Sequence, residues 1–118
     1  ISSGERMLDT ARQLKEMNAK RVFICCTFGL FTNGLKAFDE AYEKCYFDKV
    51  ITTNLTYQPP ELKTKPYFVE ADMSKFLASI IDFMNHDVSM SNVHASADKI
   101  HEIIAQYNNR EAVNMDLQ

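Results

Sequence analysis

The chain alternates short apolar runs with stretches in which apolar residues recur at helical spacing. Val22–Cys26 and Lys49–Thr53 have strand length and are rich in β-branched and bulky side chains, so we predict strands there. Because strands that alternate with helices pair in parallel, and parallel sheets are covered on both faces, the sequence predicts an α/β fold with a largely parallel sheet flanked by helices. The helical stripes comprise Met7, Leu8, Ala11, Leu14 and Met17; Leu35, Phe38, Ala41, Tyr42 and Cys45; Phe76, Leu77, Ile80, Ile81 and Met84; and Ile100, Ile103, Ile104 and Tyr107.

Prolines, glycines and capping residues mark the ends of these elements. Pro59 and Pro60 exclude a regular helix or a central strand, so residues 54–66 are predicted to be a loop, followed by a short strand at 67–69. We expect Gly29 to build the turn after the first strand, with Phe31 packed inward. The first helix is expected to end near Asn18, and the fourth to begin near Ser96. We expect Thr32 or Asn33 to cap the second helix and Asp72 to cap the third.

Composition limits the classes of protein to which the chain can belong. With 118 residues, 46% of them hydrophobic, it is long enough for one domain with its own core. A formal net charge of -3 and the lack of a basic stripe argue against a nucleic-acid partner. No apolar run has the length of a membrane span, and the first residues lack the pattern of a signal peptide. These features predict a cytoplasmic protein with no membrane partner.

The cysteines and histidines follow no pattern typical of a metal site. Cys25, Cys26 and Cys45 are odd in number, and adjacent strand residues point to opposite faces, so we predict neither a disulfide framework nor a zinc site. All three cysteines are expected to be small buried apolar residues. His94 and His101 are seven residues apart, with no converging carboxylates, so no metal ligand is assigned in this chain.

A segment rich in hydroxyls and glycine, Ile1-Ser2-Ser3-Gly4, leads directly into the first helix. Unpaired N–H groups and the positive dipole end at a helix start favour anions, small residues allow close approach, and hydroxyls add donors. The segment therefore has the character of a phosphate site. The same residues are also typical of an ordinary helix N-cap, and the sequence leaves both interpretations open.

Residues 1–4, Met7–Ala11, Lys20–Phe23 and Thr27–Gly34 together resemble the carboxy-terminal domain of ribose-phosphate pyrophosphokinase. The likeness runs to about Ser91, so residues 1–91 are expected to be a partial phosphoribosyltransferase-like domain and residues 92–118 a helical C-terminal extension. The resemblance implies the type I phosphoribosyltransferase-like fold, incomplete at its N-terminus in this chain. Many members of the family carry a histidine at the position of Phe28.

The resemblance also implies an activity. The family transfers the terminal pyrophosphoryl group of ATP to ribose 5-phosphate, with magnesium, and gives PRPP and AMP. Its catalytic loop, metal-binding histidine and most nucleotide contacts precede the region similar to this chain, so no catalytic residue is assigned here and the chain alone is expected to be inactive. The family assembles into homo-oligomers built from dimers. The alternative is a noncatalytic module of the same fold, kept for regulation or assembly.

The same resemblance assigns the phosphate group of ribose 5-phosphate to a loop of five residues: Ser2, Ser3, Gly4, Glu5 and Arg6. The family usually has a small residue in place of Glu5, and Thr or Ser in place of Arg6. An anionic Glu5 repels a phosphate unless it points to solvent, whereas Arg6 compensates through charge-assisted hydrogen bonds. A possible effector site for phosphate or ADP is assigned to Ser89 and Ser91, which resemble the family's regulatory segment.

Overall fold

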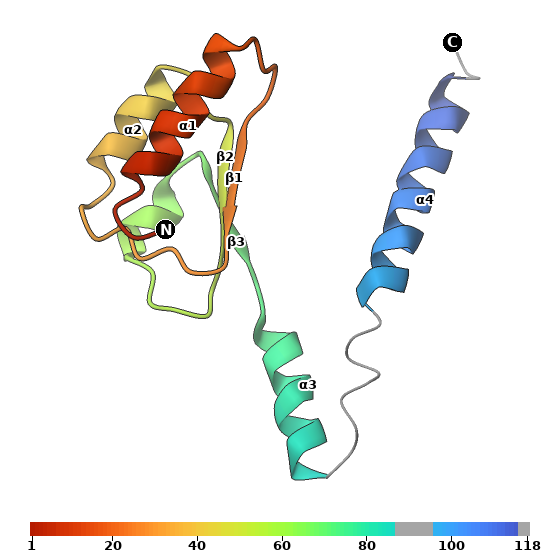
Figure 1. Cartoon of the computed structure of the whole chain (residues 1–118). Helices are drawn as coiled ribbons and strands as arrows, with labels where there is room; N and C mark the ends of the chain where they lie inside the picture. The colour runs from red at the N-terminus through yellow and green to blue at the C-terminus, as the bar shows by residue number, and fades with distance from the viewer. Residues whose placement is uncertain (87–95, 116–118) are drawn as a thin grey trace. The chain divides into compact units, whose positions relative to one another are not determined.

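The computed structural model describes residues 1–86 and 96–115, and the chain clusters into two compact units, residues 1–75 and 76–118 (Figure 1). We call them the N-terminal unit and the C-terminal unit. The N-terminal unit contains the sheet, the candidate phosphate loop and the helices that cover the sheet. Its elements, in chain order, are α1 (Glu5–Glu16), β1 (Phe23–Cys26), α2 (Lys36–Glu43), β2 (Lys49–Thr53), the 3-10 helix η1 (Pro60–Thr64) and β3 (Phe68–Ala71).

The sheet has three parallel strands in the order β1-β2-β3. Ile24 pairs with Val50, and Val50 pairs with Phe68, which sets the register across the sheet. The predicted α/β fold with a parallel sheet is thereby confirmed. The loop predicted at 54–66 contains one short 3-10 helix, which begins at Pro60, where proline's fixed φ suits a helix start.

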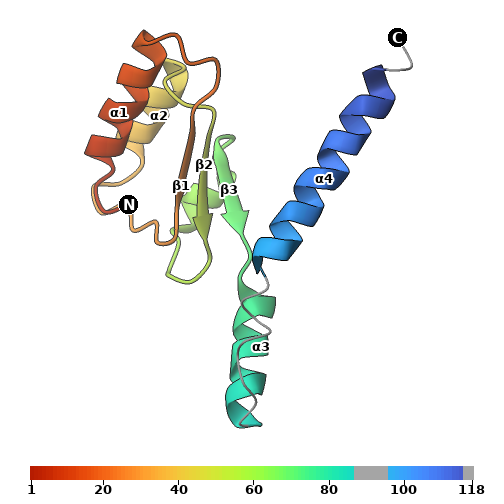
Figure 2. The ribbon, with the colours of Figure 1, turned by 45° about the vertical axis from the view of Figure 1, so that its right-hand side comes forward.

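Only one face of the sheet is covered within the N-terminal unit. Figure 2 shows α1 and α2 on the same side of the strands, and Ile24 and Val50 point into this buried layer. On the opposite face Phe23 is 48% exposed and Val69 is 40% exposed, and the Arg21 guanidinium lies 4.8 Å from the centre of the Phe23 ring. This differs from the expected cover on both faces, because α1 and α2 both pack on the same side and Leu62 of η1 joins the same core.

The buried layer is built around Phe38 of α2, whose side chain is fully buried. The Phe38 ring meets Phe31 edge-on at 5.1 Å and Phe47 at 6.3 Å between centroids. Tyr67 closes the cluster and donates its hydroxyl to Asp39 at 2.8 Å. Burial raises the pKa of Tyr67, and the bond to Asp39 raises it further, so the phenol stays protonated. The predicted inward packing of Phe31 is confirmed.

Two helices end in the same way, with a left-handed residue after the last turn. Asn18, at φ 65°, and Ala19 donate to Lys15 and Leu14 carbonyls, which confirms the predicted end of the first helix. Cys45 takes the equivalent place after α2, at φ 57°. It lies beyond the helix and is exposed, and so is Cys25, while Cys26 is half-buried. The expectation that the cysteines are buried is wrong, because Cys25 lies on the open sheet face and Cys45 leaves its helix.

The start of α2 corrects a second expectation. Its N-cap is Leu35, which makes no side-chain capping bond, so neither Thr32 nor Asn33 caps the helix. Gly34, at φ 74°, turns the chain immediately before the N-cap. This extra turn moves the helix start beyond the reach of both predicted caps.

The C-terminal unit contains most of α3 (Ser74–Asn85) and all of α4 (Ser96–Met115), which begins at the predicted Ser96. None of the α3 residues is buried; Leu77 is 43% exposed and Ile81 is 56% exposed. The predicted boundary after Ser91 lies outside the described residues and stays a prediction.

Gly4 and Gly34 provide a matched test of this packing. Both have positive φ, but a Cβ on Gly4 would lie 2.3 Å from Phe38 Cζ, whereas nothing lies within 4 Å of a Cβ on Gly34. We expect Gly34→Ala to cost about 1 kcal/mol from backbone strain alone, and Gly4→Ala about 3 kcal/mol because Phe38 must also move. Urea unfolding monitored by circular dichroism measures both. Equal losses would contradict the contact between residue 4 and Phe38.

Candidate functional site

The segment before α1 is held in place by the loop that follows β1. Leu30 N donates to the Ile1 carbonyl at 2.9 Å, and Thr32 N donates to the Ser2 carbonyl at 3.1 Å. Gly29 makes this loop possible, since a Cβ there would lie 2.7 Å from the Phe31 ring. Two segments that are distant in sequence therefore fix the path of the first residues.

Gly4 forms the turn into the helix. It is the N-cap of α1, with φ 86°, in the left-handed region that favours glycine, and Phe38 lies directly beneath it. The helix itself begins at Glu5. Glu5 and Arg6, which the sequence placed in the loop, are thus the first two residues of the helix, while Ser2, Ser3 and Gly4 form the loop.

The start of α1 has no side-chain cap. The first helical bond runs from Leu8 N to the Gly4 carbonyl at 3.0 Å, so the N–H groups of Glu5, Arg6 and Met7 precede it. An ordinary N-cap would have brought a serine hydroxyl to one of these groups. Gly4, itself a favoured N-cap residue, takes that position, so the N-cap interpretation of the segment is confirmed for Gly4 and wrong only for a cap by the two serine hydroxyls. The uncapped N–H groups, with the positive dipole end, are suited to an acceptor anion.

The uncapped start opens on a hollow of about 480 Å³, lined by residues 1–7. Ser2 is exposed and Ser3 is half-buried. In the part of the chain that the structure describes, neither serine hydroxyl has a protein partner, and the Arg6 guanidinium makes no ion pair. The hollow thus combines backbone donors, two available hydroxyls and one available cation.

Glu5 is the one anionic residue of this hollow. Its side chain is exposed, and its Oε1 accepts a hydrogen bond from Asn33 Nδ2 at 3.3 Å. Asn33 lies in the loop after β1, 28 residues along the chain. Sequence reasoning assigned Asn33 only as a helix cap, and no local signal indicated this pairing with Glu5.

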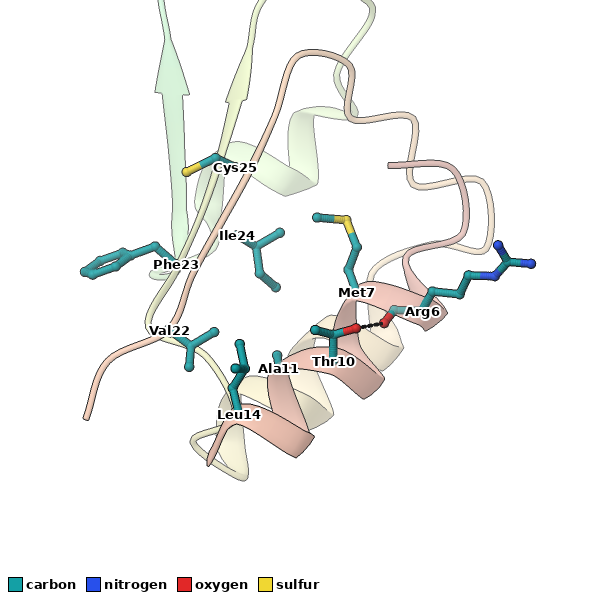
Figure 3. Close-up of a pocket in the computed structure, with 9 residues that line it drawn as sticks. All are labelled: Arg6, Met7, Thr10, Ala11, Leu14, Val22, Phe23, Ile24 and Cys25. Atoms are coloured by element: carbon teal, nitrogen blue, oxygen red, sulfur yellow. Dashed lines mark hydrogen bonds between the residues drawn. The ribbon is translucent and has the colours of Figure 1, made fainter. Parts of the chain in front are cut away.

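A second hollow, of about 450 Å³, is a groove between α1 and β1 (Figure 3). Met7, Leu14 and Ile24 project into it, whereas the Arg6 guanidinium extends away from it. The hydroxyl of Thr10 is engaged, since it donates to the Arg6 carbonyl at 2.9 Å. This groove offers mainly apolar surface, so it does not suit a phosphate.

Polar residues also meet at the carboxyl ends of β2 and β3. Asn54 Nδ2 donates to Asp72 at 2.8 Å, Met73 N donates to Asn54 at 2.9 Å, and Ser74 donates to Asp72 from both its N–H and its hydroxyl. The bonds from Ser74, followed by that from Asn54, lower the pKa of Asp72 to about 2. The predicted cap by Asp72 is confirmed, because it accepts Ser74 N at the start of α3.

The remaining expectations fall partly outside the structure. Ser89 and Ser91 lie outside the described residues, and their effector role stays a prediction. Within residues 1–86 and 96–115, no three His, Cys, Asp or Glu side chains form a group able to hold a metal ion. Across the same residues, no helix has both the length and the apolar character needed to cross a lipid bilayer.

Comparison with known proteins assigns the chain to no family. The chain matches no protein-family model, and no curated protein matches it.

The hydrogen bonds to Asp72 make the free energy of unfolding depend on pH. Because the folded pKa is lowered to about 2, ionised Asp72 contributes stability above the unfolded pKa of about 3.9, and this contribution is lost as the pH falls through about 2. We expect wild type to exceed Asp72→Asn in free energy of unfolding at pH 7, with the difference closing between about pH 4 and pH 2. Urea unfolding across this range measures it. A pH-independent difference would contradict the network.

Proposed function

We propose that residues Ser2–Met7 bind the phosphate group of ribose 5-phosphate in a ribose-phosphate diphosphokinase. The observation that carries the proposal is the start of α1, which has no side-chain cap and where three consecutive N–H groups belong to residues that line a hollow. The order of sequence segments that resemble that family adds the identity of the sugar phosphate. A phosphate monoester offers several acceptor oxygens, which can pair with the N–H groups of the helix start, the two serine hydroxyls and Arg6.

Each residue of the loop has a distinct role in the proposed complex. The N–H groups of Glu5, Arg6 and Met7 donate to phosphate oxygens along the helix axis, and the hydroxyls of Ser2 and Ser3 donate from the loop. Arg6 has no competing ion pair among the described residues and can supply a charge-assisted bond. Gly4 keeps the turn free of side-chain bulk, so the anion approaches the backbone closely.

The proposed reaction attaches the pyrophosphoryl group of ATP to the anomeric hydroxyl of the sugar and releases AMP. The contribution of this chain is to hold the sugar by its phosphate, so that binding energy positions the distant hydroxyl. Magnesium neutralises phosphate charge in such transfers, but the described residues provide no ligand set for it, and no step is assigned to them through a metal. Use of ATP agrees with the expected cytoplasmic location.

A noncatalytic phosphoribosyltransferase-like module, used for regulation or assembly, is the second candidate. The exposed apolar residues of α3 and α4, such as Ile81 and Ile104, favour it because exposed apolar stripes are typical of contact surfaces. Synthesis of PRPP by the full-length protein separates the two. Turnover supports the enzyme, whereas phosphate binding without turnover supports the module.

Calorimetry tests the loop directly. We expect the chain to bind ribose 5-phosphate and inorganic phosphate at roughly millimolar concentrations, and ribose not at all. Ser3→Ala should weaken binding by about 1 kcal/mol, or up to about 3 kcal/mol if its hydroxyl bonds to charge, and Arg6→Ala should weaken it more. Arg12→Ala is the control, because Arg12 lies on the same helix but pairs with Asp9 and Glu16.

Two results would contradict the loop assignment. One is equal binding of ribose and ribose 5-phosphate by wild type, which would show that the phosphate is not recognised. The other is an equal loss of ribose 5-phosphate affinity in Arg6→Ala and Arg12→Ala. That result would show that Arg6 acts only through long-range charge attraction and not through a direct bond to the phosphate.

A further inference from the structure

We infer that Asn33 is a positioning residue, which holds the Glu5 carboxylate on the loop after β1 and so keeps the start of α1 open to a phosphate. The inference rests on the proposed function. It assigns to Asn33 a role in specificity that is separate from contact with the ligand.

Glu5 is a potential competitor of the ligand. It is the first residue of α1 and lines the same hollow. An acidic side chain in the first helical turn is attracted to the positive end of the helix and to its unpaired N–H groups. A phosphate requires those same N–H groups. A carboxylate that is free to turn toward them competes with the phosphate for these donors and also repels the incoming anion.

Asn33 is in a position to prevent this. Its amide donates to Glu5 Oε1 at 3.3 Å from a different segment of the chain. An amide is neutral, so it fixes the carboxylate without introducing a cation that would compete with Arg6 for the phosphate. The pair therefore ties the Glu5 carboxylate to the loop after β1.

The loop that carries Asn33 is itself firmly placed. Phe31 has φ 48°, and its side chain is buried, with 4% of it exposed. Gly34 N donates a hydrogen bond to the Phe31 carbonyl at 2.9 Å, which closes the turn. The bond from Thr32 N to the Ser2 carbonyl joins this turn to the phosphate loop. Asn33 thus lies two residues from a buried aromatic side chain, in a turn held by backbone hydrogen bonds.

A double-mutant cycle with inorganic phosphate as the probe tests the inference. Asn33 and Glu5 are exposed, so single substitutions should leave thermal unfolding unchanged. We expect Asn33→Ala to weaken phosphate binding about three- to tenfold at low salt, the size expected for a released unit charge near the ligand. Adding Glu5→Gln to Asn33→Ala should restore the affinity to about that of Glu5→Gln alone.

The outcomes separate this inference from the proposed function. If wild type fails to bind phosphate, both are overturned. If wild type binds and Asn33→Ala binds equally well, Asn33 has no positioning role and the proposed function stands. If Asn33→Ala weakens binding but Glu5→Gln does not rescue it, Asn33 acts on the ligand or the loop independently of Glu5, and the inference is also overturned.

Discussion

The contact between Phe38 and residue 4 is the constraint on which both the core and the candidate site depend. Phe38 is fully buried, packs edge-on against Phe31 and Phe47, and leaves no space for a Cβ at Gly4. Gly4 then turns in the left-handed region and starts α1 without a side-chain cap. The aromatic core beneath α1 thereby determines that the helix begins with unpaired donors, and a surface property follows from buried packing.

The polar and apolar surfaces near α1 lie on different sides of its first turn. The hollow at residues 1–7 presents donors, one available cation and the Glu5 carboxylate, whereas the groove between α1 and β1 presents mainly apolar side chains such as Leu14 and Ile24. Arg6 and Met7 contribute to the lining of both, but the Arg6 guanidinium extends away from the groove (Figure 3). This separation leaves the cation available to an anion at the helix start.

The periodicity of the sequence predicted the strands, the four helices and the parallel sheet, because each pattern is local. It did not predict the open sheet face. Val22–Cys26 is apolar throughout, and such a run looks the same whether one face or both are covered. The place of Cys45 was also missed, because its left-handed turn has no glycine to signal it.

The candidate site was predictable only in part. Ser2, Ser3 and Gly4 carry a recognisable local pattern, and the structure keeps them together with Glu5 and Arg6 around one hollow. The bond between Asn33 and Glu5 joins residues 28 positions apart, so it depends on tertiary packing that no sequence period encodes. Specificity that arises from such pairs is accessible only after the fold is known.

The central claim is that an anion binds at the start of α1, and the backbone amide shifts of Glu5, Arg6 and Met7 test it most directly. Titration of the ¹⁵N-labelled chain with ribose 5-phosphate should move these three resonances most, because their N–H groups gain an anionic acceptor. Resonances of the apolar groove, such as that of Ile24, should stay in place. Shifts centred on the groove, or none at the helix start at saturating ligand, would contradict the account.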